Sequence, residues 1–416
     1  MPPRYQLQLL RRIGILATCA PHGGQGELHL IPNAALAWDN GLIRWVGPER
    51  ELPHEYQGWE NWDAAGRLVI PGLVDCHTHL AFGGWRAEDF EQRIAGHSYQ
   101  DIARAGGGIL STVARTRAAG ATVLSDRAAQ FLLQMLRLGV TTVEAKSGYG
   151  LDLDTELLLL RIYRRLAGDG PVRVVPTFLG AHTVPAEYRD RRERYIDLVI
   201  RRMIPAVATE RLARFCDVFT EEGAFSIAES RRILGAGKAV GLVPKLHADQ
   251  LSSSGGAELA AELGAASADH LECISDAGIA ALAGSGTVAV SLPLASLYLD
   301  HRPLPARKLI DAGVPVAVAT DFNPGSAPSF HLPFAMTLAC TLQRMSPAEV
   351  LKGATIVAAK AIGIEAVAGS LEAGKAADFA VIDADSVNQW LYHLQANACT
   401  MTVCGGRRSW PDASSA

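Results

Sequence analysis

The residues VIPGLVDCHTH at Val69–His79 decide how the rest of this 416-residue chain is interpreted. The stretch begins as an apolar run typical of a buried strand, and it ends in two histidines separated by one residue. Alternate residues of a strand point to the same face, so both imidazoles can reach one ion. A His-x-His pair also arises often by chance, and alone it does not establish a metal site.

Apolar runs of strand length recur along the chain from this stretch to about residue 320. Helix-like segments separate them, including one that Asp154 caps and Gly168 ends and another bracketed by Ser125 and Gly139. The expected strands are Val69–Asp75, Thr141–Ala145, Val172–Leu179, Phe215–Phe219, Val243–Leu246, Ala266–Ala268, Val288–Leu292 and Val314–Ala319. Eight strand–helix units predict a (β/α)8 barrel of the TIM type, whose sites lie on the loops that follow the strands.

The two ends of the chain have a different pattern. Leu36–Asp39 and Leu42–Val46 are short strand-like pieces separated by Asn40-Gly41, a hairpin signal, and the tail has similar pieces at Asp378–Ile382 and Thr400–Val403. We therefore expect residues 1–68 and 369–416 to form one small β-sandwich-like domain, and residues 69–368 to form the barrel.

Composition excludes several classes of protein. Lys and Arg number 39 against 43 Asp and Glu, so no general basic field is available to bind nucleic acid or an anionic membrane. No apolar run reaches the roughly 18 residues of a membrane span. The seven cysteines include no Cys-x-x-Cys pair, which favours reduced thiols in the cytoplasm. The expected partner is a small-molecule substrate, and a homodimer is expected only by analogy.

Further candidate metal ligands also follow predicted strands. His247, His270 and Asp321 come directly after the strand-like runs at Val243–Leu246, Ala266–Ala268 and Val314–Ala319. Polar residues placed at random would not all fall at the same end of the strands, so a shared metal site is favoured over separate buried histidines. Imidazoles with one carboxylate suit zinc and leave a coordination position open, but iron or manganese would also accept them.

With these residues the chain resembles the amidohydrolase superfamily, through IPGLVDCHTH at 70–79 and the strand-end His247, His270 and Asp321. Within that superfamily it is similar to the imidazolonepropionase family, which opens a ring in histidine degradation. The motifs that carry this similarity are FGG at 82–84 with Arg86, ARAGGGI at 103–109, EAKSGYG at 144–150, GAH at 180–182 and ATDFNPGS at 319–326.

The resemblance implies a metal site and a substrate site. One Zn or Fe ion would be bound by His77, His79, His247 and Asp321, and the substrate would be surrounded by Arg86, Tyr149, His182, Gln250, Asn323, Gly325 and Ser326. A substrate with a carboxylate and a flat polar ring requires an Arg fork and amide-type groups. Without the motifs, Arg86 beside Glu88 would be interpreted as a surface ion pair, and Tyr149 as a core or rim aromatic.

The implied reaction is metal-dependent hydrolysis of the cyclic amide of 4-imidazolone-5-propanoate to N-formimidoyl-L-glutamate, with His270 and Asp321 as catalytic residues. Deaminase relatives place a Glu three residues after the strand-five histidine, whereas this chain has Gln250. A Gln side chain cannot serve as an acid or base, which weakens a deaminase interpretation and leaves proton transfer to His270 or Asp321. The segment Pro293–Tyr298 also lacks the Gly expected after its proline.

Three alternatives stay open at this stage. Strand four ends in Thr220-Glu221-Glu222, without a Lys that could be carboxylated to bridge two metals, so one ion is the simpler expectation. Glu221 could still bind a second ion or orient a ligand histidine. The chain could also be another cyclic amidase or an aromatic deaminase. From a different class, it could be a metal-free barrel scaffold without catalysis, because fold does not fix function.

Overall fold

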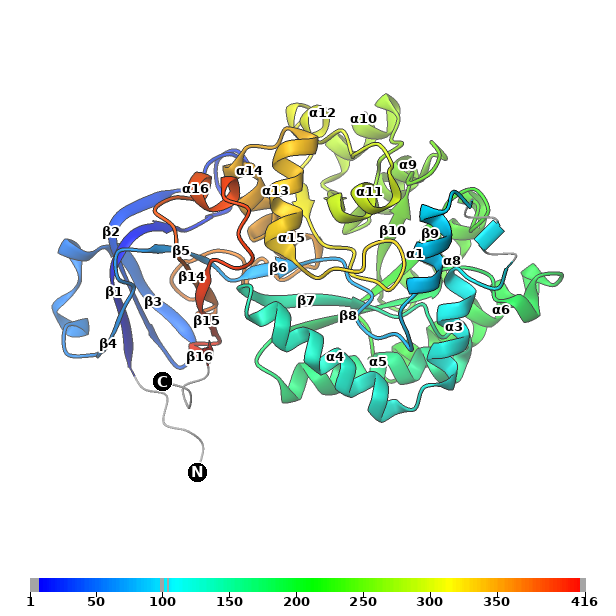
Figure 1. Ribbon diagram of the computed structural model, residues 1–416, viewed down its shortest axis with the longest axis horizontal. Coiled ribbons are helices and arrows are strands. Elements are labelled where there is room, and N and C mark those ends of the chain that lie inside the picture. Colours follow the sequence, from blue (N-terminus) through cyan, green and yellow to red (C-terminus); the bar gives the residue numbers. More distant parts are fainter. Residues whose placement is uncertain (1–6, 98–100, 103–104, 412–416) are drawn as a thin grey trace.

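The computed structural model describes residues 7–97, 101–102 and 105–411 (Figure 1). Ala103 and Arg104, which belong to the motif at 103–109, lie outside the described residues. Figure 1 shows a barrel of strands surrounded by helices and, beside it, a separate sheet that contains strands from both ends of the chain.

Eight parallel strands form the barrel and neighbour one another in chain order. They are β6 (Leu73–Asp75), β7 (Val140–Lys146), β8 (Arg173–Ala181), β9 (Phe215–Thr220), β10 (Val243–Ala248), β11 (Ser267–His270), β12 (Val288–Ser291) and β13 (Val316–Val318). Each overlaps one strand expected from the sequence, and nearly all their residues are buried. The predicted (β/α)8 barrel is therefore confirmed.

The barrel closes just beyond its first and last strands. Thr78 and Phe322 form a parallel bridge there. The amide of Asp321 donates to the carbonyl of His77 over 3.1 Å, and the amide of His79 donates to the carbonyl of Phe322 over 2.8 Å. The seam of the barrel therefore lies between the residues that the sequence singled out as metal ligands.

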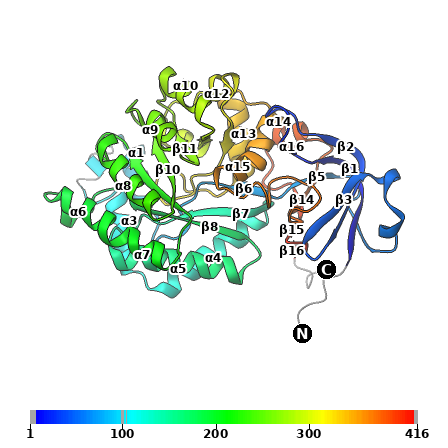
Figure 2. The same ribbon diagram turned by 180° about the vertical axis from the view of Figure 1, so that it is seen from behind.

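Helices follow most of the barrel strands and cover the outside of the barrel (Figures 1 and 2). They are α1 (Ala87–Ile94), α3 (Ile109–Ala118), α4 (Ala121–Leu136), α5 (Leu153–Asp169), α6 (Arg192–Leu198), α7 (Ile204–Thr209), α8 (Ile227–Ala239), α9 (Gly256–Leu263), α10 (Asp276–Ser285), α11 (Pro293–Leu299), α12 (Ala306–Asp311), α13 (Leu332–Gln343), α14 (Pro347–Gly353), α15 (Ile356–Ala361) and α16 (Val387–Tyr392). No helix in the described ranges is both long enough and apolar enough to cross a bilayer.

Three helix boundaries differ from the prediction. Gly168, expected to end α5, lies inside that helix, which continues to Asp169. The cap of α5 is Asp152, whose carboxylate accepts from the amide of Thr155 over 2.8 Å, and not Asp154, which lies in the first turn. Ser125 lies inside α4, which begins four residues earlier, and its buried hydroxyl accepts from Arg165. Asp and Ser are both residue types that favour helix caps. Ser125 nevertheless lies within the helix, where its hydroxyl contacts Arg165.

The second sheet joins the two ends of the chain. Its strands are β1 (Gln8–Ala17), β2 (Leu30–Asp39), β3 (Leu42–Pro48), β4 (Glu60–Asp63), β5 (Leu68–Pro71), β14 (Phe379–Ile382), β15 (Cys399–Cys404) and β16 (Arg407–Trp410), in the order β16-β15-β14-β5-β1-β2-β3 with β4 beside β1. Asn40 and Gly41 connect β2 to β3 with φ of 51° and 77°, as a type I′ turn requires. The small β-domain built from both termini is thus confirmed.

The first predicted strand is divided between the two sheets. β5 pairs with β14 in the small sheet, whereas β6 pairs with β7 in the barrel, and Gly72 separates them. A Cβ at Gly72 would lie 2.2 Å from Oγ1 of Thr141, so only glycine fits where the chain passes from one sheet to the other. The continuous apolar pattern at Val69–Asp75 conceals this change of sheet.

Candidate active site and metal centre

The candidate ligands all lie at the carboxyl-terminal mouth of the barrel. His77 and His79 follow β6, His247 and His270 lie at the ends of β10 and β11, and Asp321 follows β13. None is more than 2% exposed. His270 and Asp321 adopt left-handed backbone conformations with φ of 79° and 55°, and strain of this kind clusters at functional sites.

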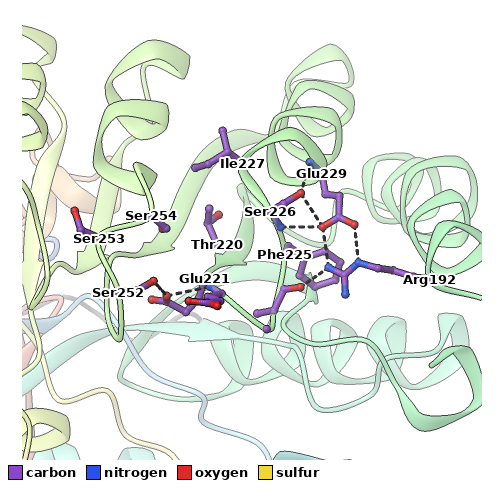
Figure 3. A pocket seen from close by; sticks show the side chains of 13 residues that line it. Arg192, Thr220, Glu221, Phe225, Ser226, Ile227, Glu229, Ser252, Ser253 and Ser254 are labelled. Atoms are coloured by element: carbon purple, nitrogen blue, oxygen red, sulfur yellow. Dashed lines mark hydrogen bonds and ion pairs between the residues drawn. The ribbon is translucent and has the colours of Figure 1, made fainter. Parts of the chain in front are cut away.

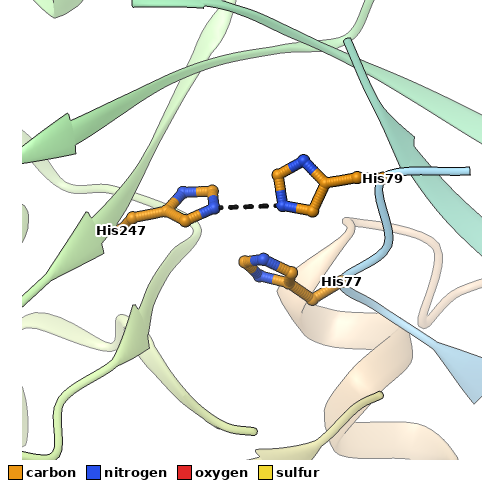
Figure 4. Close-up of side chains that lie close together, drawn as sticks. All are labelled: His77, His79 and His247. Atoms are coloured by element: carbon orange, nitrogen blue, oxygen red, sulfur yellow. Dashed lines mark hydrogen bonds between the residues drawn. The ribbon is translucent and has the colours of Figure 1, made fainter. Parts of the chain in front are cut away.

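Three of these side chains, those of His77, His79 and His247, lie close together with their rings facing a common point (Figure 4). Each of His77, His79 and His247 offers one ring nitrogen, and these three nitrogens lie within 4.8 Å of one another. Nε2 of His79 is 3.4 Å from Nε2 of His247, and Oδ1 of Asp321 is 3.4 Å from Nε2 of His77 and 3.5 Å from Nε2 of His79. The structure therefore brings together all four residues for which the resemblance implies metal binding.

The protonation and hydrogen bonding of the three histidines suit the binding of a divalent cation. Nε2 of His77 is buried and has no hydrogen-bond partner among the described residues, while its Nδ1 is 2.6 Å from Asp269. Burial holds the pKa of His77, His79 and His247 well below the usual range, helped by Lys146 beside His77 and His247 and by His182 beside His79. Neutral imidazoles with a free lone pair are the form that binds a metal.

The pKa values of the two predicted catalytic residues are both raised, but for different reasons. Burial raises the pKa of Asp321 to about 6. Burial lowers the pKa of His270, but the carboxylates of Glu272, Asp321 and Asp269 together raise it more, so the net direction is upward. Oε1 of Glu272 is 3.6 Å from Nδ1 of His270 and also accepts from the hydroxyl of Ser296 over 3.1 Å. Sequence reasoning missed Glu272, although it lies only two residues beyond His270.

Arg86 lies at the same mouth. It directly precedes α1, and its guanidinium rests against Gly325, where a Cβ would lie only 1.3 Å from Nη2. Nε of Arg86 is buried and has no partner in the part of the chain that the structure describes. A buried, unpaired guanidinium donor is costly unless a ligand completes its hydrogen bonds. Because of this close fit, any side chain at position 325 would displace the guanidinium of Arg86.

Aromatic rings line another side of the site. The ring of His182 stacks on His79 at 5.0 Å between centroids, and Tyr149 lies 5.6 Å from His79 and 5.5 Å from His182. Burial lowers the pKa of His182 to about 4, so it is neutral at physiological pH, and its Nδ1 is 3.1 Å from the carbonyl of Gly148. These rings provide flat surfaces beside the metal ligands.

The loop after Asp321 is organised by Asn323. Its amide nitrogen donates to the carbonyl of Asp321 over 2.6 Å and to Oγ of Ser326 over 2.8 Å, and its amide oxygen accepts from the backbone of Gly325 and Ser326, each over 2.8 Å. The Asn323 side chain therefore shapes the loop that carries three predicted substrate residues. Gln250, in the loop after β10, is partly exposed.

A cavity of about 660 Å³ lies beside the loops that follow β9 and β10 (Figure 3). Its walls include Arg192, paired with Glu229, and Glu221, whose carboxylate accepts from the amide of Leu251 over 2.8 Å and from the hydroxyl of Ser252. Among the described residues, Glu221 belongs to no group close enough to share an ion. The geometry gives no support to a second metal at Glu221, and it assigns this residue to holding the loop that carries Gln250.

Five fully buried charged residues lie close below the ligands, and sequence reasoning did not assign them a role. They are Glu144, Lys146, Asp217, Lys245 and Asp269. The signal that could have found them is the alternation of Glu144 and Lys146 within an otherwise uncharged strand, since alternate residues share one face. Charges on an inward face indicate partners from neighbouring strands.

Comparison with known proteins places the chain among its relatives. Residues 68–408 match the amidohydrolase family. The chain is 50% identical over 403 residues to the imidazolonepropionase of Symbiobacterium thermophilum, covering 95% of both chains. It is 46% identical over 404 residues to that of Geobacillus thermodenitrificans, covering 96% of this chain and 95% of the relative.

A solved structure agrees in fold. The atrazine chlorohydrolase of Arthrobacter aurescens, complexed with zinc, superposes with a TM-score of 0.73 at 17% identity and covers 96% of this chain and 94% of its own. The family match and the two sequence relatives confirm the resemblance found in the sequence motifs. With about half its residues identical to these relatives over almost its whole length, the chain belongs to the imidazolonepropionases of the amidohydrolase family.

Proposed function

We propose that this chain hydrolyses the cyclic amide of 4-imidazolone-5-propanoate and releases N-formimidoyl-L-glutamate in histidine degradation. The observation that carries the proposal is the convergence of His77, His79, His247 and Asp321 at the barrel mouth. The same mouth holds Arg86, whose buried Nε has no partner among the described residues. A site for a metal ion and a site that can bind a carboxylate therefore share one mouth. This arrangement matches a substrate that has a ring carbonyl at one end and a propionate at the other.

The four residues His77, His79, His247 and Asp321 would hold one divalent ion, either zinc or iron. When bound, such an ion supplies Lewis acidity that polarises a carbonyl and lowers the pKa of water. The donor set fits this ion because the imidazoles are neutral and Nε2 of His77 has no other partner in the described chain. Imidazole and carboxylate ligands do not discriminate between the two metals.

Proton transfer falls to His270 and Asp321. The reaction forms a bond between the water oxygen and the ring carbonyl carbon, breaks the bond from that carbon to the ring nitrogen, and moves one proton from water to the nitrogen. Nδ1 of His270 faces Glu272, so Nε2 is the atom that takes up and returns the proton. Asp321 lies at the same mouth, with Oδ1 3.4 Å from Nε2 of His77, and would pass that proton to the leaving nitrogen.

Substrate binding falls to the groups around the ligands. Arg86 binds the propionate, since its buried Nε donor lacks a partner among the described residues. The stacked ring of His182 and the nearby Tyr149 contact the flat imidazolone. Gln250, with its amide, and the Gly325–Ser326 segment held by Asn323 complete the polar surroundings.

The test is a spectrophotometric assay of imidazolone propionate consumption, coupled to a metal assay of the purified protein. We expect consumption by the metal-loaded protein, loss of activity with a chelator, and recovery when zinc or iron is restored. Ammonia release from an aromatic ring, without consumption of imidazolone propionate, would identify a deaminase instead. A protein that purifies gently without metal and stays inactive after loading would be the scaffold of the third alternative.

Several finer expectations remain predictions. They are the division into residues 1–68, 69–368 and 369–416, the cytoplasmic location and the homodimer. Size-exclusion chromatography with light scattering measures the oligomeric state, and limited proteolysis at the segment borders tests the division.

A further inference from the structure

The five buried charges below the candidate metal centre come from four strands of the barrel. Glu144 and Lys146 lie on β7, Asp217 on β9, Lys245 on β10 and Asp269 on β11, and each is 0% exposed. Removing a charged group from water costs several kcal/mol per ion, and a buried ion pair often contributes nothing to stability compared with apolar residues. This cluster therefore calls for a role other than filling the barrel.

The cluster is a connected network and not a set of separate pairs. Nζ of Lys146 lies 2.8 Å from Asp217, 3.1 Å from Glu144 and 3.3 Å from Asp269. Nζ of Lys245 lies 2.9 Å from Glu144 and 3.9 Å from Asp269. Both ammonium groups thus face Oδ2 of Asp269 and favour its ionised form.

Asp269 connects this network to the metal centre. Its Oδ2 lies 2.6 Å from Nδ1 of His77, and its Oδ1 accepts from the hydroxyl of Ser267 over 2.5 Å. A carboxylate only accepts hydrogen bonds, so Nδ1 of His77 must carry the proton. The neutral ring then has its lone pair at Nε2, the atom that is 3.4 Å from Asp321 and has no hydrogen-bond partner in the described chain.

Asp217 makes a looser contact of the same kind. Its Oδ1 accepts from the backbone amide of His247 over 3.2 Å, and its Oδ2 lies 3.1 Å from Nδ1 of His247 without the alignment of a hydrogen bond. The link from the network to His77 is therefore the stronger of the two, and it carries the inference.

We propose that Asp269 is a positioning residue for the metal centre: it fixes the tautomer and orientation of His77, and Lys146 and Lys245 hold its carboxylate in place. The proposal rests on the proposed metal site but not on the identity of the substrate. The competing view is that the network serves only to stabilise the barrel, in which case metal affinity would not respond to it selectively.

The test compares Asp269→Asn with Asp378→Asn. Asp378 is also a buried carboxylate with one ion pair, to Arg173 at 2.8 Å, but it lies beside β14 of the small sheet. Both changes keep the side-chain volume and remove one negative charge. Zinc affinity is measured on metal-free protein by competition with a chromophoric chelator, and the melting temperature of each metal-free variant is recorded alongside.

We expect the zinc dissociation constant of Asp269→Asn to rise by about 10- to 100-fold, as for other residues that orient metal ligands. For Asp378→Asn we expect a change of less than about threefold, even if its melting temperature falls as much. Equal zinc affinities for Asp269→Asn and the unsubstituted protein would overturn the proposal. An equal loss of affinity in both variants would also overturn it, because stability alone would then explain the effect.

A second measurement does not use a variant of Asp269, so it tests the proposal even if Asp269→Asn fails to fold. In the metal-free protein with ¹⁵N-labelled histidine, NMR shifts report which ring nitrogen carries the proton, and His77→Gln identifies the His77 signals. We expect protonation at Nδ1 and a bare Nε2, whereas a proton at Nε2 contradicts the proposal. Loss of zinc affinity in Asp269→Asn, in a protein that never consumes imidazolone propionate, would refute the proposed function and leave this inference intact.

Discussion

Gly325→Ala tests the role of Arg86 without removing its charge. The added Cβ would lie 1.3 Å from Nη2, 1.8 Å from Cζ and 2.3 Å from Nε of Arg86. Carbon and nitrogen atoms in contact need about 3.5 Å, so the guanidinium must move by about 2 Å. Gly325 does not need a positive φ, and the atoms in the way belong to a long side chain, so the fold can accept the methyl group.

The displaced guanidinium would no longer meet the propionate. A hydrogen bond to a charged group contributes about 1.5–3 kcal/mol, which corresponds to a rise in KM of about 10- to 100-fold. We expect kcat to change by less than about threefold, because an interaction made equally in the ground and transition states affects KM alone. The melting temperature should fall by less than about 3 °C.

Steady-state kinetics on metal-loaded Gly325→Ala, Arg86→Ala and the double variant measure these effects. Arg86→Ala should raise KM by a similar factor, and Gly325→Ala should add little in its presence, because the group it displaces is gone. An unchanged KM for Gly325→Ala, or the same increase in both backgrounds, would refute the reasoning.

Three further predictions concern proton transfer, the metal and stability. His270→Ala should lower kcat by about 10²- to 10⁴-fold with little change in KM, and a change mainly in KM would contradict its role. Chelation should lower the melting temperature measured by scanning fluorimetry, and zinc should restore it. A melting temperature that neither treatment changes would contradict the prediction that the protein binds an ion. Hydrogen bonding to Arg192 lowers the pKa of Glu229 to about 2, so this carboxylate stabilises the protein above pH 4.5 and loses its contribution as pH falls toward 2. The difference in urea midpoint between Glu229→Gln and the unsubstituted chain should therefore shrink from pH 7 to pH 3, and an equal difference at both pH values would exclude this cause.

Much of the fold could be predicted because buried parallel strands leave a clear apolar signal. The eight runs between Val69 and Ala319 each overlap a barrel strand, and Asn40-Gly41 forms the expected hairpin. The break at Gly72 could not be predicted in the same way. Both β5 and β6 are fully buried, so hydrophobicity is the same on either side, and only the packing of Thr141 shows where the sheets separate.

For the site as well, some features could be predicted from the sequence and others could not. The convergence of the candidate ligands follows from topology, because the carboxyl ends of parallel strands meet at one mouth. The contacts of Asp269 could not be predicted in this way. Its partners come from the segment after β6, from β7 and from β10, and the contacts depend on strand register. Nor does the sequence show that the amide of Asn323 is used within its own loop, because that requires the path of the backbone.

The seam of the barrel has a consequence for the order in which the protein matures. The first and last strands are three residues each and meet through the bridge of Thr78 with Phe322, flanked by His77 and Asp321. A growing chain on the ribosome lacks the carboxylate donor until most of its length has been made. The complete set of proposed ligands therefore exists only after Asp321 has been made, and an ion held by it would link the two edges of the barrel and oppose their separation.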